Sequence, residues 1–183
     1  MIVQSTISPN VLLSAAQEIF ETMVFMSIDP CEDPSPHIEG ETLLGMITFD
    51  GDIEGCFGFC CDKSCAQAVA VDMLGIEPDR DLPVADINDA IGEIVNMLMG
   101  SIKAGDQALS SVKVSIPTVV RGKEIEHDLG HQAEQMTSHI RIADQYTAAL
   151  SLFWRRGLTE DQAEKHTKAE KSALSRSMWL KEK

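Results

Sequence analysis

An acid and an amide lie three residues apart in the middle of one strongly periodic segment. Glu93 and Asn96 would be one turn apart if residues 83–103 form a helix, so their side chains would be neighbours on one face. The opposite face of that helix is apolar and comprises Ile87, Ile91, Ile94, Val95, Leu98 and Ile102. An exposed carboxylate beside a carboxamide can contact a polar partner or hold a water molecule. Glu93 and Asn96 are therefore a candidate pair for contact with a partner.

Two further residues share the polar face of this segment, Asp89 and Gly100. Asn and Gly in a helix interior each cost very roughly 0.6–1 kcal/mol relative to Ala. A solvent-exposed face that contains such unfavourable helix residues is compatible with contact to a partner. On the residues alone, an exposed Glu and Asn on a helix are usually ordinary solvated side chains, and that interpretation is the better one without further evidence.

The charge of the chain bounds the partners it can have. Its 183 residues suit one domain, and the net charge is −14. No Lys or Arg precedes Lys63, whereas 11 Asp and Glu do. Such a surface repels nucleic-acid phosphates and anionic membranes, and favours a partner with a basic rim or simply keeps the protein soluble.

No apolar run approaches the ~20 residues of a membrane span, and no secretory signal is evident, so we expect a cytoplasmic location.

Cysteine and histidine offer a second kind of chemistry. Four of the five cysteines, Cys56, Cys60, Cys61 and Cys65, cluster within ten residues, but their spacing matches no common zinc knuckle. Small buried thiols in a core are the alternative, since Cys56 and Cys60 fit an alternating strand pattern. His127 and His131 are four residues apart, as in a helical metal pair, although the helicity of that segment is uncertain.

Periodicity and turn residues predict a mixed helix and strand protein. We expect Ser8 and Asp62 or Ser64 to cap helices, Gly75 to end one, and Asp50-Gly51 to turn a hairpin. The predicted helices are 8–26, 63–74, 83–103 and one beginning at Thr159; the predicted strands are 42–49, 53–60, 111–120, 138–142 and 146–154; residues 29–40 are predicted to form a loop and 123–136 are ambiguous.

Two motifs together resemble a known family. The segment 89–100, with Glu93 and Asn96 at its centre, resembles the core motif of the CheX branch of the CheC/CheX/FliY phosphatases. The segment 115–122 looks like the Pro-Thr-x-x-x-Gly strand that follows this helix in CheX-like domains. The order of the predicted elements also matches, and the resemblance covers about residues 5–156.

The resemblance implies an α/β fold with internal pseudo-symmetry, in which layers of long helices pack on a mostly antiparallel sheet. It places a CheX-like phosphatase domain at residues 1–157 and leaves 158–183 as a C-terminal helical extension. It also implies a homodimer formed through the sheets. The first helix repeats the acid as Glu18 but has Glu21 where the second has Asn96, so one active site per chain is expected.

The activity implied by the resemblance is dephosphorylation of the aspartyl phosphate of a CheY-like receiver domain. Asn96 would orient the attacking water and Glu93 would pair with a receiver Lys. The chain would need no cofactor of its own, because the receiver supplies Mg²⁺. Two alternatives remain: a non-catalytic receiver-binding or flagellar-switch adaptor with the same fold, and a metal-binding redox protein that uses the cysteine cluster.

Overall fold

The computed structural model describes residues 7–33, 36–77, 81–121 and 133–156. The predicted helix from Thr159, the 158–183 extension, and His127 with His131 lie outside the described residues. In the described part of the chain, no helix is long and apolar enough to cross a membrane.

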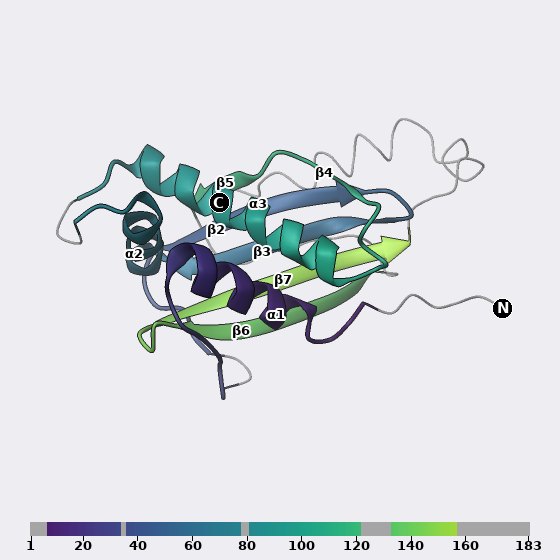
Figure 1. Cartoon of the computed structure of the whole chain (residues 1–183), viewed down its shortest axis with the longest axis horizontal. Helices are drawn as coiled ribbons and strands as arrows, with labels where there is room; N and C mark the ends of the chain where they lie inside the picture. Colours follow the sequence, from purple (N-terminus) through teal and green to yellow (C-terminus); the bar gives the residue numbers. More distant parts are fainter. Residues whose placement is uncertain (1–6, 34–35, 78–80, 122–132, 157–183) are drawn as a thin grey trace, which may run out of the picture.

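One antiparallel sheet forms one layer of the molecule and lies behind the helices in Figure 1. Its strand order is β1-β6-β7-β3-β2-β4, and β5 also pairs with β2. β4 and β5 therefore share one edge of the sheet, each along a different half of β2. The strands are β1 (Ile28–Pro30), β2 (Thr42–Asp50), β3 (Ile53–Asp62), β4 (Lys113–Val114), β5 (Thr118–Arg121), β6 (Glu134–Ile142) and β7 (Tyr146–Arg156).

The helices cover one face of this sheet (Figure 1). α1 (Val11–Ile19) continues into a π-helical turn, η1 (Phe20–Val24), and is followed along the chain by α2 (Lys63–Leu74) and α3 (Val84–Gly105). The core lies between the two layers, where alternate strand residues meet the apolar helix faces, as Phe20 of η1 meets Phe59 of β3 with ring centroids 5.8 Å apart. The fold is the predicted one, helices packed on an antiparallel sheet.

A missing side chain in β2 determines how α3 sits on the sheet. A Cβ atom added at Gly45 would lie 2.6 Å from Cγ2 of Val95 and 3.0 Å from Cγ2 of Ile91. Ile91 and Val95 are one turn apart and fully buried. The helix therefore approaches the strand more closely than any other residue at position 45 would allow, and its apolar face is locked against the sheet.

A buried aspartate holds α1 beside the end of α3. Asp106 is 8% exposed, and its carboxylate accepts hydrogen bonds from the backbone N–H of Ser8 at 2.7 Å and of Ala108 at 2.9 Å. Ser101 of α3 donates a further hydrogen bond to Glu18 of α1. These bonds connect both end regions of α1 to the C-terminal part of α3, in addition to the apolar contact between the helices.

Most predicted elements are confirmed. The hairpin over residues 42–60 forms, and helix 63–74 has the predicted ends. Asp62 caps it by accepting a hydrogen bond from the N–H of Cys65 at 2.9 Å, and Gly75 ends it in the left-handed conformation. Local signals sufficed at these positions because caps and tight turns depend on neighbouring residues only.

Three local predictions are wrong. Asn10, not Ser8, occupies the cap position of α1, because a turn closed by the N–H of Val11 on the carbonyl oxygen of Ser8 at 3.1 Å precedes the regular helix. The 29–40 loop begins within a short edge strand, β1, which pairs with β6. The strand expected over 111–120 is divided into β4 and β5, because the chain leaves and rejoins β2 with a shifted register.

The close packing of α3 on β2 can be tested by two matched glycine substitutions. We expect Gly45→Ala to lower the free energy of unfolding by about 1–3 kcal/mol, because the new methyl group collides with Val95 and Ile91. Gly100 lies on the outer side of the same helix with no atom within 4 Å of an added Cβ, so Gly100→Ala should raise stability by about 0.5–1 kcal/mol. Urea denaturation measures both, and a Gly45→Ala protein as stable as wild type would contradict this packing.

Candidate functional site

The predicted pair lies on the outer surface of α3. Glu93 and Asn96 are both exposed, whereas Ile94 and Val95 between them are fully buried. The pair is at the middle of a 22-residue helix, far from its fraying ends. Their side chains are neighbours about 5–6 Å apart at Cβ, as the three-residue spacing requires. The predicted arrangement of the two groups on one wet face is therefore what the structure has.

The surface around the pair is acidic and open. Asp86 and Asp89 are exposed on α3 together with Glu93. Lys103, at the other end of the helix, donates its ammonium hydrogen to the backbone oxygen of Val112 at 2.6 Å and is thereby held toward the sheet edge. Gly100, one turn beyond Asn96, leaves space where a side chain would otherwise stand. A partner can approach Asn96 over this glycine without a steric barrier.

The second motif of the sequence lies directly against the first. A Cβ atom added at Gly92 of α3 would lie 3.9 Å from Cγ of Pro117 and 3.9 Å from Cγ2 of Val119. The helix residue next to Glu93 is thus covered by the strand β5. The two segments that suggested the family form one continuous surface.

The first helix repeats the Glu93–Asn96 pair only weakly, at Glu18 and Glu21, and the surroundings of these two residues differ. The carboxylate of Glu18 accepts the hydrogen bond from Ser101, so it is already engaged within the chain. Glu21 falls in η1, beyond the end of the regular helix at Ile19. The two residues therefore do not repeat the geometry of Glu93 and Asn96, which agrees with the absence of an amide at position 21. One working site per chain stays a prediction.

The cysteine cluster is divided between the two faces of the sheet, with Cys61 and Cys65 in the core under the helices and Cys60 on the other face. Cys56, Cys61 and Cys65 are buried free thiols, and Cys60 is half-buried. Burial raises the pKa of Cys56 to about 12. A hydrogen bond with Cys65, together with burial, raises the pKa of Cys61. Protonated buried thiols are poor nucleophiles and ligands, and the described residues contain no group of three or more side chains suited to a metal.

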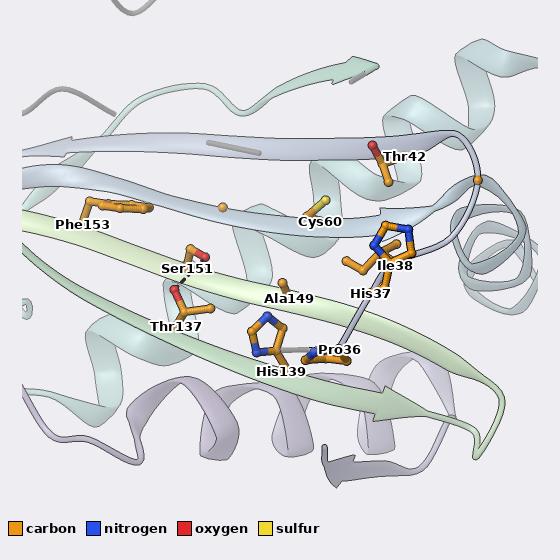
Figure 2. A pocket seen from close by; sticks show the side chains of 12 residues that line it. Pro36, His37, Ile38, Thr42, Cys60, Thr137, His139, Ala149, Ser151 and Phe153 are labelled. Carbon is orange, nitrogen blue, oxygen red and sulfur yellow. Dashed lines mark hydrogen bonds between the residues drawn. The ribbon is translucent and has the colours of Figure 1, made fainter. Parts of the chain in front are cut away.

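A hollow of about 600 Å³ lies on the other face of the sheet (Figure 2). Gly58 and Cys60 of β3 alternate with the core residues Phe57, Phe59 and Cys61, so they face away from the helices. Ala149 is opposite Cys60 on β7, and small residues here leave the hollow open. Small residues at outward positions of two central strands are a sequence signal for such a hollow, but the sequence-based predictions did not include it. The hollow is remote from Glu93 and Asn96, with the whole sheet between them.

The chain belongs to the family described as chemotaxis phosphatase CheX, whose sequence model matches residues 43–141, more than half of the chain. This match includes both motifs, the α3 pair and the following strand. No curated protein sequence matches the chain.

Several solved structures share the fold. A chemotaxis protein of Desulfovibrio vulgaris Hildenborough is 22% identical, with a TM-score of 0.64, over 80% of this chain and 95% of that one. CheX of Vibrio vulnificus is also 22% identical, with a TM-score of 0.62 and the same coverage. In a complex from Borrelia burgdorferi, CheX is bound with CheY, BeF3 and Mg²⁺; the matched chain is 17% identical, with a TM-score of 0.60, over 82% of this chain and all of that one.

The burial of Cys56 predicts a loss of stability at high pH. The folded chain keeps the thiol proton up to a pKa of about 12, whereas an unfolded chain loses it near the ordinary value of 9.0. The folded state therefore binds more protons between these values, and the free energy of unfolding should fall as pH rises above about 9. Urea denaturation from pH 8 to 10.5 measures this fall. Cys56→Ala should show a shallower fall than wild type and than Cys31→Ala; equal slopes would contradict the burial of this thiol.

Proposed function

We propose that this protein is a phosphatase that hydrolyses the aspartyl phosphate of a CheY-like receiver domain. The single observation that supports this most strongly is the exposed Glu93–Asn96 pair on α3, in a chain of the CheX family. Both groups have the types and the one-turn spacing that the resemblance requires. Such a phosphatase would act in chemotaxis or a related two-component pathway and meet its receiver in the cytoplasm.

The partner is inferred from a structural relative. CheX of Borrelia burgdorferi is found in a complex with CheY, BeF3 and Mg²⁺. By extension, the exposed face of α3 would dock on a receiver at its phosphorylated aspartate. The exposed acidic residues Asp86 and Glu93 of this face suit a partner with a basic rim, because complementary charge speeds encounter and fixes orientation.

In this proposal Asn96 supplies the positioning that an acyl phosphate needs. Its carboxamide oxygen can accept a hydrogen bond from water and its NH2 group can donate one to a phosphoryl oxygen, and the amide carries no charge to repel that group. Water held in line forms a bond to phosphorus while the bond from phosphorus to the aspartyl oxygen breaks. The products are the receiver carboxylate and inorganic phosphate, which takes up the proton of the water. Ordering the water removes an entropic cost from the barrier.

Glu93 has a separate role in this scheme. Its carboxylate would pair with the receiver Lys near the phosphoryl group and so fix the register of docking. One helical turn then places Asn96 at the phosphorus atom. The chain itself would bring no cofactor, and the Mg²⁺ at the phosphoryl group would be held by the receiver.

We also propose a homodimer formed through the sheets, as the CheX resemblance suggests. The described sheet ends in β1 on one side and in β4 with β5 on the other. Exposed strand edges offer unpaired backbone groups that a second copy can bond. Sedimentation equilibrium of the full chain would show a mass of two chains.

The catalytic roles can be separated by substitution at the two positions. We expect Asn96→Ala to slow the hydrolysis of phosphorylated receiver by about 100-fold or more, since the water is no longer oriented, while binding to the BeF3-activated receiver is kept. Glu93→Ala should weaken binding as well as the rate. The measurement is the decay of phosphorylated receiver with time, alone and with each protein.

Asp89→Ala is the matched control, because Asp89 is exposed on the same face one turn before Glu93. It should keep a rate within about threefold of wild type. Equal rates for wild type and Asn96→Ala would remove the catalytic claim. Binding without any acceleration by wild type would favour the adaptor alternative, and half the activity left in Asn96→Ala would indicate a second site in the chain.

A further inference from the structure

The edge of the sheet beside α3 contains a β-bulge. Met46 of β2 pairs with Thr118 of β5, and Phe49 of β2 pairs with Val114 of β4. The N–H of Ser115 bonds to the carbonyl oxygen of Thr48 at 2.9 Å, so this pairing extends one residue further. Only Ile47 then remains on β2, opposite two residues, Ile116 and Pro117. One extra residue in the edge strand is the definition of a bulge.

The bulge is fixed on its β4 side by Ser115. The N–H of Thr48 donates to the side-chain oxygen of Ser115 at 3.1 Å, in place of a backbone carbonyl. Pro117 has no N–H and cannot restore the ladder at the next position. The chain is therefore diverted at Ile116 and Pro117 and rejoins β2 only at Thr118.

Contacts of Gly92 and Lys103 place the bulge next to the turn of α3 that contains Glu93 and Asn96. Lys103 bonds to Val112, whereas Gly92 lies against Pro117 and Val119. The edge chain therefore runs antiparallel to α3, as Figure 1 shows. Pro117 lies against Gly92, and the edge chain runs from there toward Val112 beside Lys103. Ile116 therefore follows Pro117 along α3 in the direction of Asn96.

Ile116 is unusually exposed for its type. Its side chain is 87% exposed, above the 81% of Phe25, in a segment whose neighbour Pro117 is partly covered. An isoleucine with so little contact among the described residues adds little to the stability of the fold, yet the bulge holds it out along the flank of α3 that leads from Gly92 toward Asn96. Bulges next to active sites commonly direct a side chain in this way.

We propose that Ile116 is an apolar docking contact for the receiver, which buries against an apolar patch beside the phosphorylated aspartate. This inference rests on the proposed phosphatase function, because it uses the same partner and the same face of α3. The polar pair then orients the chemistry, and Ile116 contributes affinity through removal of apolar surface from water. Because it does not touch the reacting atoms, it sets KM and leaves kcat unchanged.

The test compares Ile116→Ser with Phe25→Ser, a control of similar exposure that follows η1 on the α1 side of α3. Single-turnover and steady-state decay of a receiver phosphorylated with acetyl phosphate give kcat and KM. We expect Ile116→Ser to raise KM about tenfold or more with kcat within twofold, and Ile116→Leu to restore most of the affinity. Phe25→Ser should match wild type.

An unchanged KM in Ile116→Ser would overturn the proposal, as would a lower kcat with unchanged KM. A raised KM accompanied by loss of the dimer in sedimentation would also overturn it and assign Ile116 to contact between two copies. If wild type accelerates no decay, the phosphatase proposal fails separately. Direct binding of BeF3-activated receiver then decides: about tenfold weaker binding by Ile116→Ser supports the docking contact, and equal or absent binding by both proteins overturns it.

Discussion

The close packing of α3 against β2 is the constraint on which the rest of the structure depends. Gly45 lets Ile91 and Val95 approach the strand at a distance that any Cβ would forbid. Since these two residues occupy one side of the helix, the rotation of α3 about its axis is fixed. Glu93 and Asn96 must then face solvent, on the opposite side. The exposure of the polar pair is thus a consequence of core packing.

Contacts at both flanks of α3 complete the site. On one flank, Asp106 and the bond between Ser101 and Glu18 hold α1 in place. On the other, Gly92 and Lys103 fix the edge chain that contains β4 and β5. Catalysis by positioning requires rigid supports. A regular helix held on three sides provides such a support for Glu93 and Asn96.

Much of this arrangement could be predicted from the sequence. A 3.6-residue period placed Glu93 and Asn96 on one face, and local caps gave the ends of α2 at Asp62 and Gly75. The larger failures had non-local causes. The short strand β1 depends on pairing with β6, and the division of the 111–120 strand depends on register against β2. Ile116 looked like an ordinary strand residue because a bulge is visible only once two strands are paired.

The most direct test of the central claim is the structure of this protein bound to a BeF3-activated CheY-like receiver. The account predicts that α3 lies across the receiver's phosphorylation site, with the side-chain amide of Asn96 within about 3 Å of the in-line water or the BeF3 group. Glu93 should lie against the receiver Lys. A complex in which the receiver contacts another face of the protein, leaving Asn96 in solvent, would contradict the account.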